Sequence, residues 1–315
     1  MKETNEKPKI VNCFYDGAIS GFGDFLRGSI HLYSRCKSHN LDFDIDIKNH
    51  PINEFISSKY KYSVKKEEIK CIPSEVLKES NMHYYKRVND FLFKKLSNAL
   101  GVCHIFSNFD YVLNVSQQHL IKVINLLPPL GEECRKWFQE NLVFSDEVKS
   151  FANKELENLG IKAKEFEIIH FRLGDEVAFR EGIKPKFWVP EDELSFKICQ
   201  KITEERESNL PILFFSDCNE LKKYVSEKSS ELGLPIHVIH LKSGHMQKQT
   251  DANKKYLSDI DFSRENLFLT AVDIRLISLA KNARSFSVYP WGSGFITWVC
   301  KIYGIPFQLN RLKQK

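Results

Sequence analysis

The chain has 315 residues, of which 42% are hydrophobic and 28% are charged, and its formal net charge is +5. This balance is typical of a soluble globular protein and excludes a disordered or fibrous chain, while the length predicts two domains or one large α/β unit. The positive charge is spread along lysine-rich segments rather than gathered in one block, which argues against nucleic-acid binding.

The N-terminus and the cysteines indicate a cellular location. No stretch reaches the roughly 18 apolar residues of a membrane-spanning helix, and residues 1–14 lack the pattern of a secretory signal. We therefore expect a cytoplasmic protein without a transmembrane segment. The eight cysteines are scattered and include no C-x-x-C pair, so we expect reduced core residues rather than a zinc site or a disulfide framework.

The first elements along the chain form a β-α-β unit. The pattern predicts a strand over 9–15, an amphipathic helix over 23–40 and a second strand over 41–47. The second strand contains D-x-D in the sequence D-F-D-I-D. Because side chains alternate along a strand, these aspartates are better explained as its polar face than as a metal-binding motif.

The middle of the chain, residues 52–150, is mostly helical in pattern but ambiguous, with its clearest helices at 89–101 and 132–142. A well-delimited helix follows over 145–160, with Ser145 as N-cap, acidic residues in the first turn and a glycine at the end. We place the domain boundary in this helix, which gives an N-terminal domain of residues 1–150 and a C-terminal domain of residues 151–315.

Strands and helices then alternate to the end of the chain. The predicted strands are 166–171, 211–216, 236–241 and 285–290, and the predicted helices are 191–208, 219–233, 266–281 and 295–304. Such alternation predicts a parallel sheet with helices on both faces. The fold class is therefore α/β, with two halves that would leave a cleft between them.

Open α/β sheets bind ligands at the carboxyl ends of their strands, and the loop after the first strand contains Gly21, Gly23 and Asp24. Its glycines permit close approach of a ligand, and the helix that follows offers N–H groups and a positive dipole end to an anion. Leu26 stands where a dinucleotide-binding loop has its third glycine. A tight turn with Asp24 as a helix-start residue explains the loop equally well.

His170 and Arg172 interrupt an otherwise apolar strand. Because they are two positions apart, their side chains point to the same side, at the carboxyl end of the strand. An arginine there can hold a phosphate with two hydrogen bonds. The structural alternative is a salt bridge from Arg172 to Asp175, with His170 as a core histidine that has a hydrogen-bond partner.

Two further loops leave strand ends. Ser216 and Asp217 end an apolar strand, and Asp217 with Glu220 matches a capping box, although a carboxylate there could equally accept the two donors of a guanine edge. The turn Gly292-Ser293-Gly294 precedes a helix that begins near Phe295. This turn repeats the anion-binding design with an added hydroxyl, and a turn without a ligand is its structural alternative.

Four segments occur in an order that resembles the fucosyltransferase superfamily of α1,2-, α1,6- and protein O-fucosyltransferases, including nodulation-type enzymes. They are G-F-G-D at 21–24, H-F-R-L-G-D at 170–175, F-F-S-D at 214–217 and the segment 276–295. The H-x-R-x-G-D segment is the most specific of the four. The last segment departs from the family pattern, which often has two adjacent serines where this chain has Ser293-Gly294.

The resemblance implies a GT-B fold of two facing Rossmann-like domains, and an inverting, metal-independent transfer of fucose from GDP-fucose to a glycan or glycoconjugate hydroxyl, with no further cofactor. Arg172 would hold the β-phosphate, Asp217 would bind the guanine, and the backbone and hydroxyl around residues 293–295 would bind the remaining phosphate oxygens.

The resemblance also implies roles for the other loop residues. His170 would line the nucleotide pocket, while Gly21 and Gly23 would let the N-terminal domain close over the sugar. Asp24 and Ser216 complete the predicted donor-binding set.

A carboxylate should deprotonate the acceptor hydroxyl. Asp175, Glu176 and Glu181 follow Arg172 in the sequence. We favour Glu181 as the base, with Asp175 and Glu176 as alternatives, because Glu181 lies far enough beyond the strand to reach an acceptor.

Other functions also fit parts of the sequence. One is another GT-B transferase of the heptosyltransferase type, which would explain G-F-G-D but not the later motifs. A second is a non-catalytic relative that binds a nucleotide or a glycan. A metal site built from His237, His240 and His245 is disfavoured, because the first two differ in strand parity.

Overall fold

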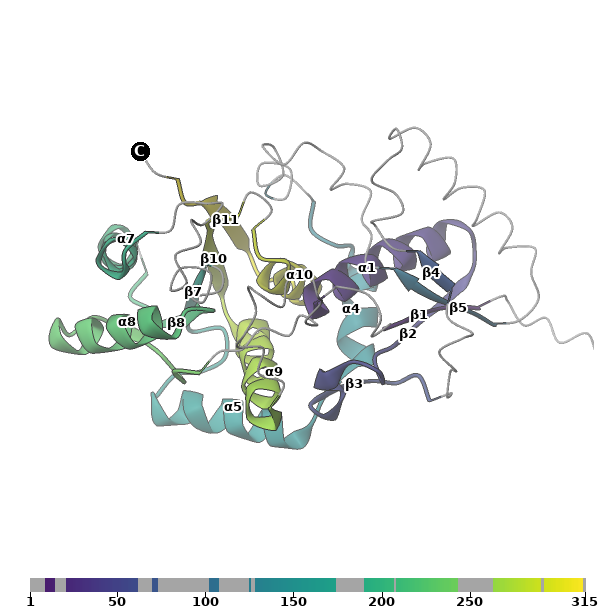
Figure 1. The fold of residues 1–315 in the computed structure, drawn as a ribbon, viewed down its shortest axis with the longest axis horizontal. Helices are drawn as coiled ribbons and strands as arrows, with labels where there is room; N and C mark the ends of the chain where they lie inside the picture. Colours follow the sequence, from purple (N-terminus) through teal and green to yellow (C-terminus); the bar gives the residue numbers. More distant parts are fainter. Residues whose placement is uncertain are drawn as a thin grey trace, which may run out of the picture.

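The computed structural model describes most of the two predicted halves of the chain. Within the described residues, two parallel sheets lie side by side, with helices around and between them (Figure 1). The described residues are 9–14, 21–61, 70–72, 102–107, 125, 128–173, 190–206, 208–242, 263–289 and 292–313.

The N-terminal sheet has the strand order β2-β1-β5-β4, and each neighbouring pair is parallel. Its strands are β1 (Lys9–Cys13), β2 (Asp42–Asp46), β4 (Lys70–Ile72) and β5 (Val102–Ser107). Helix α1 (Phe22–Ser38) connects β1 to β2. The predicted β-α-β unit is therefore confirmed. In contrast, β4 and β5 lie in the ambiguous middle of the sequence and were not predicted as strands.

The aspartates of β2 are engaged along the strand, as expected of a polar face. The carboxylate of Asp44 lies 3.2 Å from Lys9 Nζ, and Asp46 accepts a hydrogen bond from the main-chain N–H of Lys48 at 3.0 Å. Throughout the described part of the chain, no group of three or more histidine, cysteine, aspartate and glutamate residues is arranged to hold a metal ion.

The C-terminal sheet has the order β11-β10-β7-β8-β9 and is also parallel throughout. Its strands are β7 (Glu167–Arg172), β8 (Ile212–Ser216), β9 (Ile236–His237), β10 (Asn282–Ser287) and β11 (Phe307–Arg311). The predicted parallel sheet is confirmed, with differences at its edges and at the end of β10.

Two strand predictions need correction, and one strand was missed. The strand predicted over 236–241 is paired only at its first two residues, because β9 is an edge strand with β8 as its one neighbour. The strand predicted over 285–290 instead covers 282–287, where β10 pairs with both β7 and β11. Strand β11 was not predicted, since its pairing to β10 gives little signal in the local sequence.

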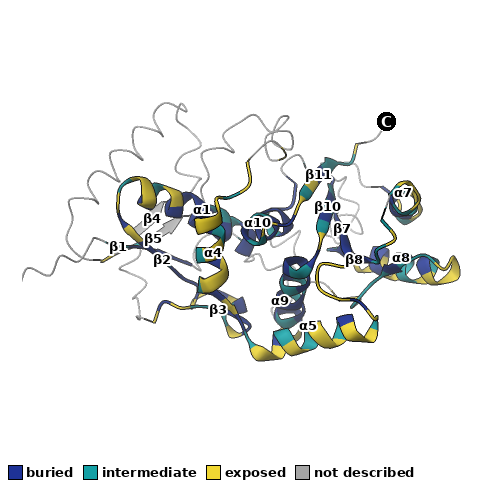
Figure 2. Ribbon diagram, turned by 180° about the vertical axis from the view of Figure 1, so that it is seen from behind, coloured by how far each residue is buried: buried dark blue, intermediate teal, exposed yellow. Residues whose placement is uncertain are grey.

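Helices cover both faces of the C-terminal sheet (Figures 1 and 2). Helices α7 (Asp192–Glu205) and α8 (Asn219–Glu231) pack on one face, and α9 (Arg264–Leu279) and α10 (Gly294–Tyr303) pack on the other. Helix α5 (Asp146–Asn158) packs against α9. In Figure 2, α9 and α10 are largely buried, whereas α5 and α8 expose their outer sides.

Side chains along β7 point alternately to the two faces of the sheet. Ile169 and Phe171 belong to the hydrophobic cluster under α7 and α8, whereas Ile168 belongs to the cluster under α9 and α10. Strand parity therefore places His170 and Arg172 on the side of the sheet that α9 and α10 cover.

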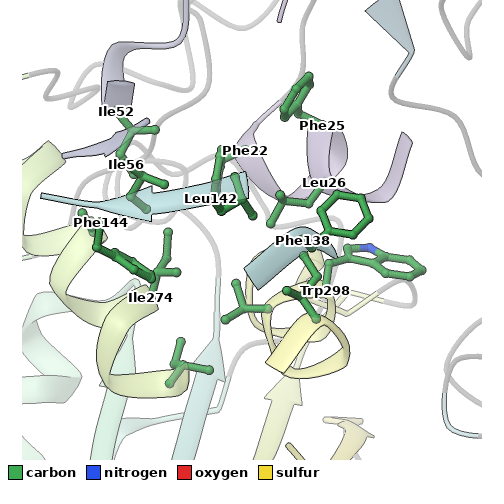
Figure 3. Close-up of a cluster of buried hydrophobic side chains, with 14 of the residues drawn as sticks. Phe22, Phe25, Leu26, Ile52, Ile56, Phe138, Leu142, Phe144, Ile274 and Trp298 are labelled. Carbon is green, nitrogen blue, oxygen red and sulfur yellow. The ribbon is translucent and has the colours of Figure 1, made fainter. Parts of the chain in front are cut away.

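One hydrophobic core joins the two halves of the molecule. The short segments η1 (Pro51–Glu54), β3 (Ile56–Ser58), α4 (Glu132–Asn141) and β6 (Leu142–Phe144) contribute to it, with β3 and β6 paired antiparallel. Figure 3 shows the residues that meet there from α1, α4, α9 and α10, among them Phe22, Leu26, Phe138, Ile274 and Trp298.

Some predictions stay open or are limited to the described residues. The domain boundary at residue 150 lies inside α5 and stays a prediction, and the helix predicted over 89–101 lies outside the described residues. The six cysteines whose side chains are described are buried thiols. No helix in the described ranges has the length and apolar character needed to cross a membrane.

Candidate functional site

The carboxyl ends of β7 and β8 bring Arg172 and Asp217 together. The two strands pair in parallel up to Phe171 and Ser216, so the next residue of each lies at the same edge of the sheet. Arg172 Nη1 donates to Asp217 Oδ2, and the main-chain N–H of Leu173 donates to Asp217 Oδ1 at 2.9 Å. Charge-assisted hydrogen bonds of this kind are among the stronger ones in proteins.

The capping box suggested for Asp217 is wrong. The N-cap of α8 is Cys218, whose Sγ accepts from the N–H of Leu221 at 3.4 Å. Ser216 is 6% exposed, and its hydroxyl accepts from the N–H of Cys218 at 3.1 Å. The carboxylate of Asp217 is directed to β7 instead, because a guanidinium and an N–H group stabilise it there.

Arg172 is held from two sides. Its guanidinium carbon lies 5.4 Å from the centre of the Tyr289 ring, within the range of a cation–π interaction, and its Nη1 donates to Asp217. Its side chain stays 23% exposed. The alternative salt bridge to Asp175 involves a residue outside the described ranges.

His170 is a buried histidine with a hydrogen-bond partner. It is 6% exposed, and its Nδ1 lies 2.9 Å from the hydroxyl of Ser285, its direct neighbour on β10. Burial lowers the pKa of His170 to about 4, so the ring is neutral near pH 7. This agrees with the structural alternative, and its role in lining a nucleotide pocket stays a prediction.

A short turn leads from Tyr289, whose ring contacts Arg172, to the start of α10. The N–H of Gly292 donates to the carbonyl of Tyr289 at 3.1 Å, and Gly292 has a left-handed φ of 71°. A Cβ on Gly292 would also lie 2.4 Å from Leu309 Cδ2. The chain therefore needs a glycine here to turn from β10 into α10.

Ser293 is the N-cap of α10, yet its side chain makes no capping hydrogen bond. It is 6% exposed, and Gly294 and Phe295 follow it as the first two residues of the helix. A hydroxyl and helix N–H groups at one point favour an anion, since both donate and the dipole is positive there. The predicted phosphate-binding residues 293–295 therefore follow directly after the turn whose Tyr289 contacts Arg172.

The first turns of α1 and α10 are in direct contact. A Cβ on Gly23 would lie 2.6 Å from both the carbonyl carbon of Gly294 and the nitrogen of Phe295. Asp24 lies in the same turn and pairs with Arg27 at 3.2 Å, while Gly21 is the N-cap of α1. The predicted N-terminal residues are thus brought to the predicted phosphate-binding turn.

Two charged residues near this edge were not singled out from the sequence. Lys222 is 2% exposed, although it carries a charge, and Asp273 Oδ1 lies 2.7 Å from His240 Nε2. Helical periodicity could have predicted that Lys222 is buried. It lies on the same face of α8 as the buried residues Leu221, Val225 and Ser229. For Asp273 the signal was an acid within the largely apolar helix α9.

The predicted catalytic carboxylates lie outside the described part of the chain. Asp175, Glu176 and Glu181 belong to residues 174–189, and His245 of the disfavoured metal site belongs to residues 243–262. His240 is engaged by Asp273.

Comparison with known proteins gives a fold. No model of a known protein family matches the sequence, and no curated protein matches it. Solved structures do match. A mutant of FUT1 from Arabidopsis thaliana in complex with GDP is 12% identical, with a TM-score of 0.54, over 98% of this chain and 71% of that one.

Two further solved structures resemble the chain. POFUT1 in complex with GDP-fucose is 12% identical, with a TM-score of 0.50, over 100% of both chains. The α-1,6-fucosyltransferase NodZ, soaked with GDP-fucose, is 10% identical, with a TM-score of 0.48, over 94% of this chain and 93% of that one. The chain has a fucosyltransferase-like fold. The predicted α/β, GT-B-like class is thereby confirmed.

Proposed function

We propose that the protein is a glycosyltransferase that transfers fucose from GDP-fucose to a hydroxyl of a glycan or glycoconjugate. One observation carries the proposal: the Arg172 guanidinium, at the carboxyl end of β7, contacts Tyr289, and the Tyr289 carbonyl accepts from Gly292 in the turn that leads to Ser293, the N-cap of α10. The likeness to FUT1 solved with GDP and POFUT1 solved with GDP-fucose supports this choice of donor.

The pyrophosphate of the donor would bind between Arg172 and α10. The guanidinium offers a rigid pair of donors to one phosphate, and the Tyr289 ring fixes its plane. The hydroxyl of Ser293 and the N–H groups of the first turn would donate to the other phosphate oxygens. In the free protein, Asp217 neutralises Arg172.

An exchange of partners would prepare the site for the guanine base. When a phosphate binds to Arg172, Asp217 Oδ2 would lose its hydrogen bond from the guanidinium. Asp217 Oδ1 would keep its hydrogen bond from the N–H of Leu173, which is 2.9 Å long in the free protein. A carboxylate oxygen accepts hydrogen bonds, and the guanine edge presents two N–H donors. Phosphate binding and base binding would therefore support each other.

The reaction would be inverting and metal-independent. The acceptor oxygen attacks the anomeric carbon as the bond from that carbon to the pyrophosphate breaks, and the acceptor proton passes to a carboxylate. Negative charge grows on the departing GDP, where a fixed guanidinium and N–H donors stabilise it. Loss of one such donor typically costs about 100- to 1,000-fold in rate.

The proton acceptor is proposed among Asp175 and Glu181. Both follow Arg172 in the sequence, so they leave the same strand end that carries the phosphate-binding arginine. Glu181 is preferred, because it is farther from the strand along the sequence. Substitution of each by the matching amide separates the two, since loss of the base lowers kcat and leaves GDP binding intact.

Calorimetry with four nucleotides tests the proposal. GDP, UDP, ADP and CMP are titrated into the wild-type chain, Arg172→Ala and the control Arg264→Ala, whose side chain is 59% exposed on α9. We expect selective binding of GDP that is lost in Arg172→Ala and kept in Arg264→Ala. Preference for another nucleotide would indicate a different GT-B transferase, and the absence of nucleotide binding would refute a donor site at Arg172.

A further inference from the structure

A buried lysine lies beside the end of β8. Lys222 is the fourth residue of α8 and is 2% exposed, whereas the side chain of its neighbour Lys223 is 68% exposed. Burial of an ammonium is costly unless the charge is paired and hydrogen-bonded. Near the start of a helix the positive end of the dipole adds to this cost. A lysine in this place therefore requires compensating partners.

The Lys222 ammonium finds hydrogen-bond partners in the segment after β9. It donates to the carbonyl of His240 at 3.3 Å and to the carbonyl of Lys242 at 2.7 Å. His240 Nδ1 lies 2.6 Å from the same carbonyl of Lys242, to which it can only donate. Lys222 therefore ties α8 to residues 240–242 by direct bonds.

Two carboxylates supply the opposite charge. Asp273 and Asp217 favour the charged form of Lys222, while burial acts more strongly and lowers its pKa. His240 Nε2 lies 2.7 Å from Asp273 Oδ1, which connects α9 to the same segment. All three charged groups also act electrostatically on His170. They therefore lie within electrostatic range of His170, which is on the same strand as Arg172.

We propose that Lys222 is a positioning residue for recognition of the nucleotide base. The inference rests on the proposed function. The main-chain N–H of Lys222 donates to the carbonyl of Cys218, the residue after Asp217, at 3.1 Å. Its ammonium holds residues 240–242 in place, and through His240 it also holds Asp273. The guanine depends on this arrangement, whereas the pyrophosphate is bound by Arg172 and the start of α10.

A matched pair of variants tests the inference. Lys222→Met and Lys223→Met make the same change of charge at adjacent positions of α8, one buried and one exposed. Binding of GDP and of inorganic pyrophosphate is measured by calorimetry for both variants and the wild type. We expect Lys222→Met to weaken GDP binding about 10- to 100-fold, as loss of a residue that orients a ligand-binding group does. Pyrophosphate binding should be unchanged in both variants.

The outcomes separate this inference from the proposed function. If the wild type binds no GDP, the proposed function fails and the inference fails with it. If the wild type binds GDP but Lys222→Met loses GDP and pyrophosphate equally, or loses neither, only the positioning role is wrong. A merely structural role would lower the melting temperature without changing the ratio of the two affinities.

A second variant covers the case in which Lys222→Met does not fold. His240→Ala removes the contact with Asp273 and leaves the ammonium and its bond to the carbonyl of Lys242 in place. The same selective loss of GDP affinity is expected, with pyrophosphate binding retained. Wild-type affinity for GDP in His240→Ala would overturn the inference.

Discussion

Gly23 in the first turn of α1 lies directly against Gly294 in the first turn of α10. The contact is between main chains, because a Cβ on Gly23 would lie 2.6 Å from the carbonyl carbon of Gly294. The relation is not symmetric: a Cβ on Gly294 would meet Asp24 Oδ1 at 3.7 Å and the carbonyl carbon of Gly23 at 3.8 Å, which are ordinary distances. Only Gly23 must therefore be a glycine for the two helices to meet.

Gly23→Ala should destabilise the protein, and Gly294→Ala should not. The added methyl group of Gly23→Ala must push the two helices apart, and overpacking of this kind costs about 1–3 kcal/mol. Gly294→Ala places its methyl group in ordinary van der Waals contact at a helix position, so its effect should stay within about 0.5 kcal/mol. Urea unfolding of both variants measures the difference. Equal stability of the two would show that the helices can separate without cost.

Asp217→Asn should leave Arg172 with an unbalanced charge. The side chains are 14% and 23% exposed, so water compensates only in part, and we expect a loss of about 1–3 kcal/mol in the free energy of unfolding. The control Asp146→Asn breaks an ion pair with Lys149 in which the carboxylate is 97% exposed, and it should cost less than about 1 kcal/mol. Thermal unfolding of both variants checks the prediction. A similar small loss in both would mean that Arg172 does not need Asp217.

Stability should fall as the pH is lowered from about 7 to about 5. Burial lowers the pKa of His31 and of His170 to about 4 and that of His50 to about 3, whereas the ordinary value is 6.5. Between about pH 6.5 and 4 the unfolded chain therefore binds more protons than the folded one, so the free energy of unfolding decreases as the pH falls through this range.

His170→Gln isolates one of these groups, because glutamine is polar but does not titrate. Over the step from about pH 7 to about pH 5, the variant should lose about 2 kcal/mol less stability than the wild type. Urea unfolding at the two pH values provides the measurement. The same pH dependence in both proteins would show that His170 is protonated to the same extent before and after unfolding.

The sequence predicted the elements whose ends are marked by nearby residues, such as a capping serine, a terminal glycine or the end of an apolar run. The helix ended by Gly304 is one case, because this residue has a left-handed φ of 65° and closes α10. The helix begun by Ser145 is another, since its hydroxyl accepts from the N–H of Val148 as a cap does. The apolar runs of β7 and β8 were equally clear, because both strands are buried on two faces.

The pairing and side-chain contacts of segments far apart in the chain could not be predicted from such local residues. Strand β11 and the pairing of β3 with β6 depend on partners far away in the chain. The sequence near Asp217 matches a capping box, yet the guanidinium of Arg172 on the neighbouring strand decides where the carboxylate points. Contacts of this kind depend on the strand order of the sheet, which local periodicity does not specify.

Ser263→Ala should lower the stability of the protein more than Ser293→Ala does, although both residues are helix N-caps. The hydroxyl of Ser263 accepts from the N–H of Asn266 at 3.3 Å, so its loss removes a cap from α9 and should cost about 1 kcal/mol of stability. Ser293 makes no such bond on α10, so its loss should change stability by less than about 0.5 kcal/mol.

The effects on GDP binding should be reversed between the two serines. The proposed function uses the hydroxyl of Ser293 as a phosphate donor, and a hydrogen bond to a charged group contributes about 1.5–3 kcal/mol, so Ser293→Ala should weaken GDP binding roughly 10- to 100-fold. Ser263→Ala should bind GDP as the wild type does. Thermal unfolding and calorimetry on the same samples give both quantities. If Ser293→Ala loses stability but keeps its GDP affinity, then its hydroxyl supports α10 and does not bind a phosphate.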